Sequence, residues 1–239
     1  MRSNLSDTQA VVLDVGGVLL VPHAEPLAAA LAGLGVPVGP SSVVRAHYVG
    51  VRALDEAPTP GDAPSRYLDA YTRALGVPDA LLQRATSVLH HLWVGPSPQL
   101  WRHPVPGSLD RLRRLAESGH QLAVVSNSDG TVEALLTAHR ICQIGAGAGV
   151  PVCAIVDSAI VGVAKPDPRI FHALAEQVGI IPERAVYVGD TVRYDVLGAR
   201  AAGLHPLLFD PYDLCASHDD HAHVRSLDDV VDLLGRRSP

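Results

Sequence analysis

VVLDVGGVL, residues 11–19, is the stretch on which the expected fold depends. It begins with a short apolar run rich in β-branched side chains, which is typical of a buried parallel strand. The run ends at a lone carboxylate, Asp14, and the two glycines that follow let the backbone turn sharply and approach a ligand closely. In open α/β sheets, ligands bind at the carboxyl ends of the strands. An aspartate at that edge can be a nucleophile, a metal ligand or a helix cap.

The composition limits the class of protein. The chain has 239 residues, of which 47% are hydrophobic and 18% charged, so it can bury an ample globular core. Its net charge of −6 gives no electrostatic reason to expect nucleic acid or a membrane surface as a partner. The cysteines, Cys142, Cys153 and Cys215, are odd in number and form no C-x-x-C pair, which favours free thiols. Without a signal-like or membrane-spanning apolar run, we expect a soluble, cytoplasmic protein.

The order of predicted helices and strands along the chain indicates two domains. Residues 23–99 are almost purely helical, with helices expected at about 25–34, 41–54, 62–75 and 78–92. After a proline-rich connection, helices alternate with apolar strands at 121–125, 152–156, 185–188 and 206–209, which indicates a parallel sheet covered on both faces. The strand that ends at Asp14 belongs to that sheet. We therefore predict a doubly wound α/β core, residues 1–22 and 100–239, with a helical domain, 23–99, inserted into it.

Two later stretches place polar groups where a phosphate could be held. The apolar run at 124–125 ends in Ser126 and Asn127 just before a predicted helix. A hydroxyl and the free N–H groups of such a turn suit phosphate oxygens, although a simple helix cap has the same pattern. Lys165 is followed by a proline that holds the lysine backbone extended. A lone lysine is usually a solvated charge, but this restrained one is compatible with an inward role.

The stretch YVGDTVRYD, residues 187–195, contributes two carboxylates. Asp190 ends an apolar strand, and Asp195 follows near the first turn of the next predicted helix. Like charges at close range disfavour joint ionisation, so this pair is costly without a cation. Mg²⁺ is commonly held by one or two carboxylates together with a substrate phosphate, and it would remove that cost.

Taken in this order, the four stretches resemble the haloacid dehalogenase superfamily of phosphatases and related hydrolases, and the inserted helices look like its helical cap. The resemblance covers the whole core. It implies that Asp14 is the nucleophile and that Lys165 stabilises the charge on Asp14 and on the transferring phosphoryl group. It also implies a substrate site and a Mg²⁺ site: Gly17, Ser126, Asn127 and Lys165 for the substrate, and Asp14, the carbonyl of Gly16, Asp190 and, directly or through water, Asp195 for the metal.

One position departs from the family pattern. In the family's phosphatases a second aspartate usually stands two residues after the nucleophile as general acid and base, and here that residue is Gly16. A positioned acid or base typically contributes about 10²- to 10⁴-fold in rate. The leading interpretation is a Mg²⁺-dependent hydrolase of small phosphorylated metabolites, slowed by this loss. The alternatives are a weak or inactive binding protein on the same fold and a dehalogenase-like hydrolase, against which the Asp190 and Asp195 pair argues. The physiological substrate and the oligomeric state are left open.

Histidine-rich positions offer further candidates. A substitute proton donor could come from His23, His47, Tyr48, Arg52 or His103, although we interpret each as an ordinary surface or half-buried residue. The segment HDDHAH at 218–223 has the composition of a metal cluster. It lacks helix-period or finger-like spacing with cysteine, so we predict a solvated loop.

Overall fold

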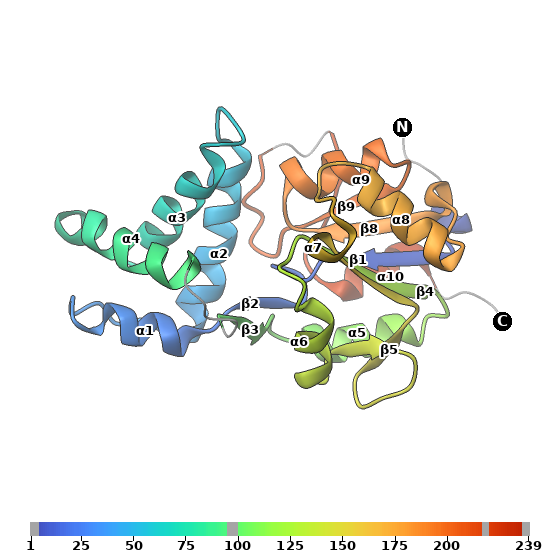
Figure 1. Cartoon of the computed structure of the whole chain (residues 1–239), viewed down its shortest axis with the longest axis horizontal. Coiled ribbons are helices and arrows are strands. Elements are labelled where there is room, and N and C mark those ends of the chain that lie inside the picture. The colour runs from blue at the N-terminus through green and yellow to red at the C-terminus, as the bar shows by residue number, and fades with distance from the viewer. Residues whose placement is uncertain (1–4, 95–99, 217–219, 236–239) are drawn as a thin grey trace. The chain divides into compact units, whose positions relative to one another are not determined.

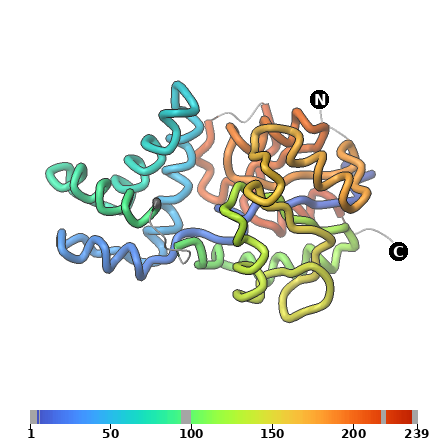
Figure 2. Tube along the Cα trace, in the orientation of Figure 1, coloured from blue at the N-terminus to red at the C-terminus, as the bar shows by residue number. Residues whose placement is uncertain are grey.

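A computed structural model describes residues 5–94, 100–216 and 220–235. Its contacts divide the chain into two compact units, here called the core unit (Met1–Leu19 with Pro106–Pro239) and the helical unit (Leu20–Val105). Figure 1 labels many of their elements, and Figure 2 follows the chain through them. No helix among the described residues combines the length and apolar character needed to cross a membrane.

The described part of the core unit is built on a parallel six-stranded sheet. Its strands are β1 (Ala10–Leu13), β4 (Gln121–Ser126), β7 (Ala154–Asp157), β8 (Ala185–Gly189), β9 (His205–Phe209) and β10 (Ala222–Val224). They are arranged in the order β10-β9-β8-β1-β4-β7, and every neighbouring pair is parallel. The blue N-terminal strand β1 therefore lies in the middle of the sheet, between strands from much later in the chain (Figure 2).

Helices cover both faces of this sheet. On one face, alternate strand residues such as Val12 and Tyr187 pack against α8 (Arg169–Val178) and α9 (Leu197–Ala201). Val11 and Leu13 point to the opposite face and are fully buried as well. In Figure 1, α5 (Ser108–Ala116) lies on the side of β1 away from α8, and α5 packs against α10 (Leu227–Leu234). Burial of both faces explains the continuous apolar strands and confirms the doubly wound α/β core.

The remaining core elements are short. They are η1 (Leu5–Asp7), α6 (Val132–Ala138), β5 (Cys142–Ile144), β6 (Val150–Val152), α7 (Ser158–Val161), η2 (Pro182–Arg184) and the π-helical turn η3 (Val192–Val196). The parallel pair β5–β6 was not predicted, and the strand expected at 152–156 is centred on β7. The helix predicted to begin near Asp195 starts with the wider turn η3, where the Thr191 hydroxyl accepts a hydrogen bond from the Asp195 N–H.

The segment predicted as a solvated loop at 218–223 contains part of a strand. Residues 222–224 form β10, which pairs with β9 at the edge of the sheet. The loop prediction is wrong there because a three-residue edge strand bearing polar side chains has too little apolar alternation to be recognised. His218 and Asp219 lie outside the described residues.

The helical unit contains the four predicted helices. They are α1 (Ala24–Ala32), α2 (Pro40–Asp55), α3 (Ala63–Ala74) and α4 (Asp79–Val94). The unit also contains an antiparallel pair that was not predicted, β2 (Leu20–Pro22) and β3 (Trp101–Pro104). At Gly50, any Cβ would lie within 2.8–3.0 Å of Tyr67 atoms, so this glycine lets α2 approach α3 closely. The prolines at 96 and 98, near the predicted boundary at 99, lie outside the described residues.

Three of the proposed proton donors lie on α2 of the helical unit and are buried. His47, Tyr48 and Arg52 on α2 are 3%, 0% and 8% exposed, so their interpretation as surface or half-buried residues is wrong. For His47 the reason is the close packing of α2 against α3, in which the His47 Nδ1 and the Tyr67 hydroxyl oxygen are 2.9 Å apart. His23 and His103 are half-buried, with ring centroids 5.8 Å apart. Burial, reinforced by the neighbouring His23, lowers the pKa of His103.

Candidate active site

The strand ends bring the predicted polar residues to one edge of the sheet. Leu13 is paired with Val124 on β4 and with Val188 on β8. Asp14, Ser126 and Asp190 therefore come at the carboxyl ends of three adjacent strands. Asp14, Ser126 and Asp190 are all buried, and within the described residues the Ser126 hydroxyl makes no hydrogen bond.

Lys165 reaches this edge from the segment before α8. Its Nζ lies 2.8 Å from Asp14 Oδ2 and 2.7 Å from Asp195 Oδ1, and it donates a hydrogen bond to the Tyr187 hydroxyl at 2.8 Å. The lysine backbone is held from both sides by Asn127, whose Nδ2 donates to the Lys165 carbonyl and whose Oδ1 accepts from the Lys165 N–H. The inward role considered for Lys165 thus matches its position, and Asn127 has a positioning contact in addition to its predicted contact with substrate.

Asp195 is held by donors on both carboxylate oxygens. Oδ1 accepts from the Lys165 ammonium and, at 3.0 Å, from the Tyr187 hydroxyl, while Oδ2 accepts from the N–H and the hydroxyl of Thr191 at 2.9 and 2.6 Å. A carboxylate offers about four acceptor positions. The protein itself therefore satisfies Asp195. Gly189 makes this possible, because a Cβ there would lie only 2.3–2.7 Å from Asp195 atoms.

The charges of the cluster act on one another. Burial, the largest influence, raises the pKa of Asp14 to about 7; Lys165 opposes the rise, and Asp195 and Asp190 add to it. Burial would also raise the pKa of Asp195, but the Lys165 ammonium and the hydrogen bonds from Lys165 and Thr191 outweigh it and lower that pKa. Burial would lower the pKa of Lys165, and the two aspartates raise it instead. Of the two carboxylates that contact Lys165, Asp14 is thus the one whose charge is less well compensated.

The donor set fits a hard divalent cation. Asp14, Asp190 and Asp195 each offer an oxygen, all within 4.8 Å of one another, and all three side chains are buried. Three ionised carboxylates beside the single Lys165 ammonium leave an excess of two negative charges, which a divalent ion would balance. Oxygen-only ligands suit Mg²⁺. Asp195 already accepts four hydrogen bonds from the protein, so its oxygens are the less available for direct contact with a metal.

Several residues that shape this site were missed by sequence reasoning. Tyr187 lies in the middle of an apolar strand, yet its hydroxyl bonds to Asp195 and to the Val125 carbonyl. Asp157, at the end of β7, accepts hydrogen bonds from the N–H groups of Gly130 and Val132 and so orders the turn after Ser126. A polar tip within a buried strand is a signal that could have identified Tyr187. Asp157 directly follows the strand predicted at 152–156, which is the same signal that pointed to Asp14 and Asp190.

The sequence was compared with protein families and with known proteins. The model of the haloacid dehalogenase-like hydrolase family matches residues 8–203. The chain is 36% identical over 137 residues to haloacid dehalogenase-like hydrolase domain-containing protein 3 of Mus musculus, covering 57% of this chain and 51% of the relative. It is 30% identical over 145 residues to the glyceraldehyde 3-phosphate phosphatase of Methanopyrus kandleri, covering 60% of this chain and 58% of that protein.

The alignments with these curated relatives span little more than half of the relatives' own length. Among solved structures, a haloacid dehalogenase-type phosphatase from Thermococcus onnurineus aligns with a TM-score of 0.56 over 96% of this chain and 99% of that one, at 18% identity. That likeness shows the fold. Because the family model covers most of the sequence, including every residue of the cluster at the strand ends, the chain belongs to the haloacid dehalogenase-like hydrolase family.

Proposed function

We propose that this chain is a Mg²⁺-dependent hydrolase of small-molecule phosphate monoesters that works through an aspartyl-phosphate on Asp14. The observation that carries the proposal is the buried Asp14 carboxylate, which faces the Lys165 ammonium at 2.8 Å and lies in a cluster with Asp190 and Asp195. A nucleophile, a fixed cation and oxygen ligands at one sheet edge are the parts that phosphoryl transfer to a carboxylate requires. The matched phosphatase of Methanopyrus kandleri supports the same class of substrate.

The chemistry assigned to the chain's own residues is as follows. An Asp14 oxygen attacks phosphorus, an O–P bond forms, and the ester oxygen leaves with the alcohol and takes up a proton. Water then cleaves the aspartyl-phosphate, releasing phosphate and the free carboxylate. Lys165 compensates charge on Asp14 and on the phosphoryl oxygens, while Gly17, Ser126 and Asn127 hold those oxygens. When bound by Asp14, Asp190 and the Gly16 carbonyl, Mg²⁺ would supply the remaining positive charge that lets two anions meet.

Asp195 acts through Lys165 in this proposal. Its four acceptor positions are used by Lys165, Tyr187 and Thr191, so it positions the ammonium and reaches a metal only through water. The helical unit, predicted at 23–99, serves as the cap that selects the substrate. The free thiols of the three cysteines support a reducing, cytoplasmic setting.

Hydrolysis of an aryl phosphate tests the proposal, because an activated leaving group needs little protonation. We expect turnover with Mg²⁺, loss of turnover on chelation with EDTA, and recovery when Mg²⁺ is returned. Asp190→Asn should shift the Mg²⁺ dependence to much higher concentration. Turnover that is unaffected by EDTA would contradict the metal-dependent mechanism.

Gly16→Asp is expected to raise turnover of alkyl phosphates by about 10²- to 10⁴-fold, the usual contribution of a positioned general acid and base. The backbone allows the change, because Gly17 has a φ of +71° whereas Gly16 lies outside the left-handed region. The measurement is kcat on an alkyl and an aryl phosphate side by side. The gain should be much smaller on the aryl ester, and an equal gain on both would contradict the acid–base explanation.

Gly16 is also the observation that favours a second candidate function. In this alternative the chain is a binding protein that retains the fold and hydrolyses its ligand weakly or not at all. The alternative predicts that the wild type binds a phosphate analogue without hydrolysing the aryl ester and that Gly16→Asp restores hydrolysis. Turnover of the aryl ester by the wild type at a rate close to that of Gly16→Asp would contradict it.

A further inference from the structure

A second group of metal-binding side chains lies in the core unit, apart from the cluster around Asp14. One ligand atom from each of Cys215, His221 and His223 lies within 4.8 Å of the other two. Cys215 is buried, and both histidines are half-buried. The mechanism proposed above uses none of these three residues.

Local structure explains how the two histidines come together. His223 lies in β10 and His221 immediately precedes that strand. Side chains two residues apart along a strand point to the same face. The two rings accordingly stack, with centroids 4.8 Å apart and planes at 11°. The spacing H-x-H therefore gives two imidazoles on one face, an arrangement that helix or zinc-finger spacing would not have suggested.

A buried carboxylate fixes the third residue beside them. Asp210 follows β9, is 1% exposed, and accepts hydrogen bonds from the N–H groups of Leu214 and Cys215 at 3.1 and 2.8 Å. Its Oδ2 also lies 3.8 Å from His223 Nδ1. One carboxylate thus holds the turn that carries Cys215 and lies against one of the histidines, so the three ligands rest on an ordered framework.

From this arrangement we propose that Cys215, His221 and His223 bind Zn²⁺, with Asp210 as the neighbouring carboxylate that orients His223 and balances charge. Cys215 Sγ lies 3.8 Å from His221 Nε2. In a tetrahedral zinc site with Zn–S of about 2.3 Å and Zn–N of about 2.0–2.1 Å, that separation is about 3.6 Å. Thiolate and imidazole ligands favour Zn²⁺ over Mg²⁺, in contrast to the oxygen-only cluster at Asp14.

The site would connect the edge of the sheet to the candidate active site. Cys215 packs with Val196 and Leu208, and Val196 directly follows Asp195. Packing as a small apolar residue accounts for the burial of Cys215. It does not account for two stacked imidazoles and a buried carboxylate beside the thiol. The role that follows for the metal is structural, holding β10 and the turn after β9 against η3.

Cobalt provides the test, because a thiolate ligand gives Co²⁺ a charge-transfer absorption in the near ultraviolet that oxygen ligands do not give. Metal-free, reduced protein is titrated with Co²⁺ in excess Mg²⁺, so that cobalt at the carboxylate cluster adds no such band. We expect the band, with ligand-field bands typical of a tetrahedral site, to saturate at one equivalent and to disappear when Zn²⁺ is added. Zn²⁺ should also raise the Tm of the metal-free protein.

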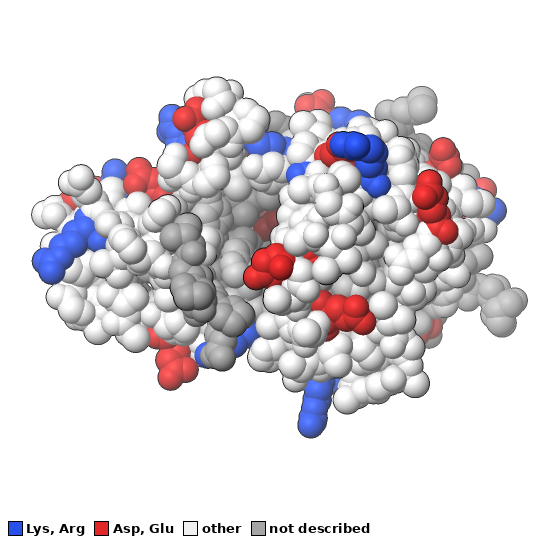
Figure 3. Space-filling view, in the orientation of Figure 1, with Lys and Arg blue, Asp and Glu red and all other residues white. Residues whose placement is uncertain are grey.

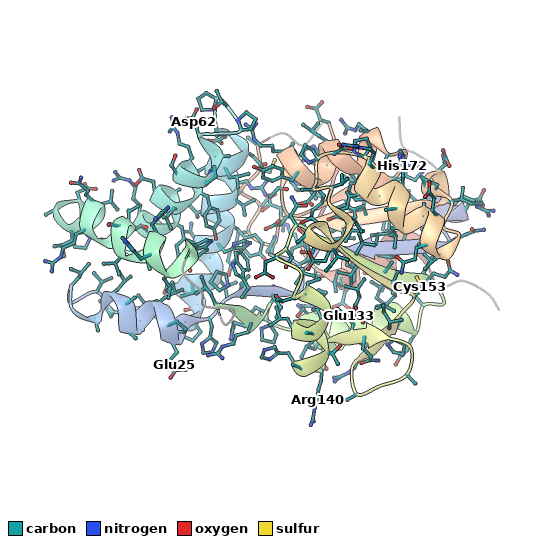
Figure 4. The ribbon with its side chains drawn as sticks, viewed as in Figure 1. Glu25, Asp62, Glu133, Arg140, Cys153 and His172 are labelled. Carbon is teal, nitrogen blue, oxygen red and sulfur yellow. The ribbon has the colours of Figure 1, made fainter. Side chains whose placement is uncertain are left out.

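Cys215→Ser should abolish the charge-transfer band and the rise in Tm. Cys153→Ser, at the half-buried cysteine that precedes β7 and is labelled in Figure 4, should preserve both. If Cys215→Ser fails to fold, His221→Gln keeps the thiol and should weaken cobalt binding by at least about tenfold. Absence of the band in the wild type, its persistence in Cys215→Ser, or ligand-field bands without it would each overturn the proposal, and all of these readouts are independent of phosphatase activity.

Discussion

Asp14→Asn is expected to lower hydrolysis of an aryl phosphate by on the order of 10⁴- to 10⁶-fold, down to the background rate, because it removes the attacking carboxylate. The amide keeps the size of the side chain and can still contact Lys165. The measurement is kcat under saturating Mg²⁺, together with a search for phosphate attached covalently to the wild type. Residual turnover within about tenfold of the wild type would contradict the assignment of Asp14 as nucleophile.

The same substitution should stabilise the metal-free protein at neutral to alkaline pH. The pKa of Asp14 is about 7 in the folded chain, where burial raises it, against 3.8 for an ordinary aspartate. The folded state therefore binds the Asp14 proton more tightly, and the associated stability is complete below about pH 4 and is lost as the pH rises through about 7. Asparagine does not ionise, so the variant does not lose this stability as the pH rises. We expect Asp14→Asn to exceed the wild type by at least about 1 kcal/mol at about pH 8, or roughly 2–4 °C in Tm.

Two controls distinguish this effect from a gain in stability that is independent of pH. The advantage of Asp14→Asn should shrink as the pH falls toward about 4 and as Mg²⁺ is added, because protonation and a cation each relieve the carboxylate. Asp167→Asn should show no stabilisation at high pH. Arg169 lowers the pKa of Asp167 to about 2, so the ionised form of Asp167 is favoured in the folded chain. An advantage of Asp14→Asn that is independent of pH would contradict the linkage.

The sequence was enough to predict the sheet and the residues at its edge, because both depend on local pattern. A buried parallel strand is apolar along its length, and the first polar residue after it lies at the carboxyl edge. Asp14, Ser126 and Asp190 were predicted on that basis, and the structure places them on adjacent strands. The distribution of surface charge gives little indication of the site. In the view of Figure 3, charged side chains of both signs are scattered over the surface.

Long-range contacts could not be predicted from the sequence. Asn127 and Lys165 are 38 residues apart, and only the fold brings the amide to the lysine backbone. Tyr187 lies within an apolar strand, and only the fold brings its hydroxyl to Lys165 and Asp195. The approach of Cys215 to His221 depends on the pairing of β10 with β9, two strands separated in the sequence by residues 210–221. In each case a polar contact is determined by tertiary packing, on which local propensity has no bearing.

Lys165→Met is expected to lower both stability and turnover. Methionine matches the length of the lysine but leaves Asp14 and Asp195 buried without the ammonium that lies 2.8 and 2.7 Å from them. Removing one partner of a buried ion pair typically costs about 3–5 kcal/mol of unfolding free energy. Loss of a cation that stabilises a transferring phosphoryl group typically costs about 10³- to 10⁵-fold in rate. Chemical denaturation and kcat measure the two effects separately.

Tyr187→Phe is the matched control for Lys165→Met, because it removes a hydroxyl from the same cluster and leaves every charge in place. It should lower the free energy of unfolding by about 1–3 kcal/mol, because the buried hydrogen-bond partners of the hydroxyl are left unsatisfied. That loss should vary little with pH. The cost of Lys165→Met should instead grow as the pH rises from about 4. Without the ammonium, the folded-state pKa of Asp14 rises beyond its value of about 7, and ionisation then opposes folding over a wider range. Equal and pH-independent costs for the two variants would mean that Lys165 acts by packing, whereas a pH-dependent cost confined to Lys165→Met would show that its charge holds the carboxylates together.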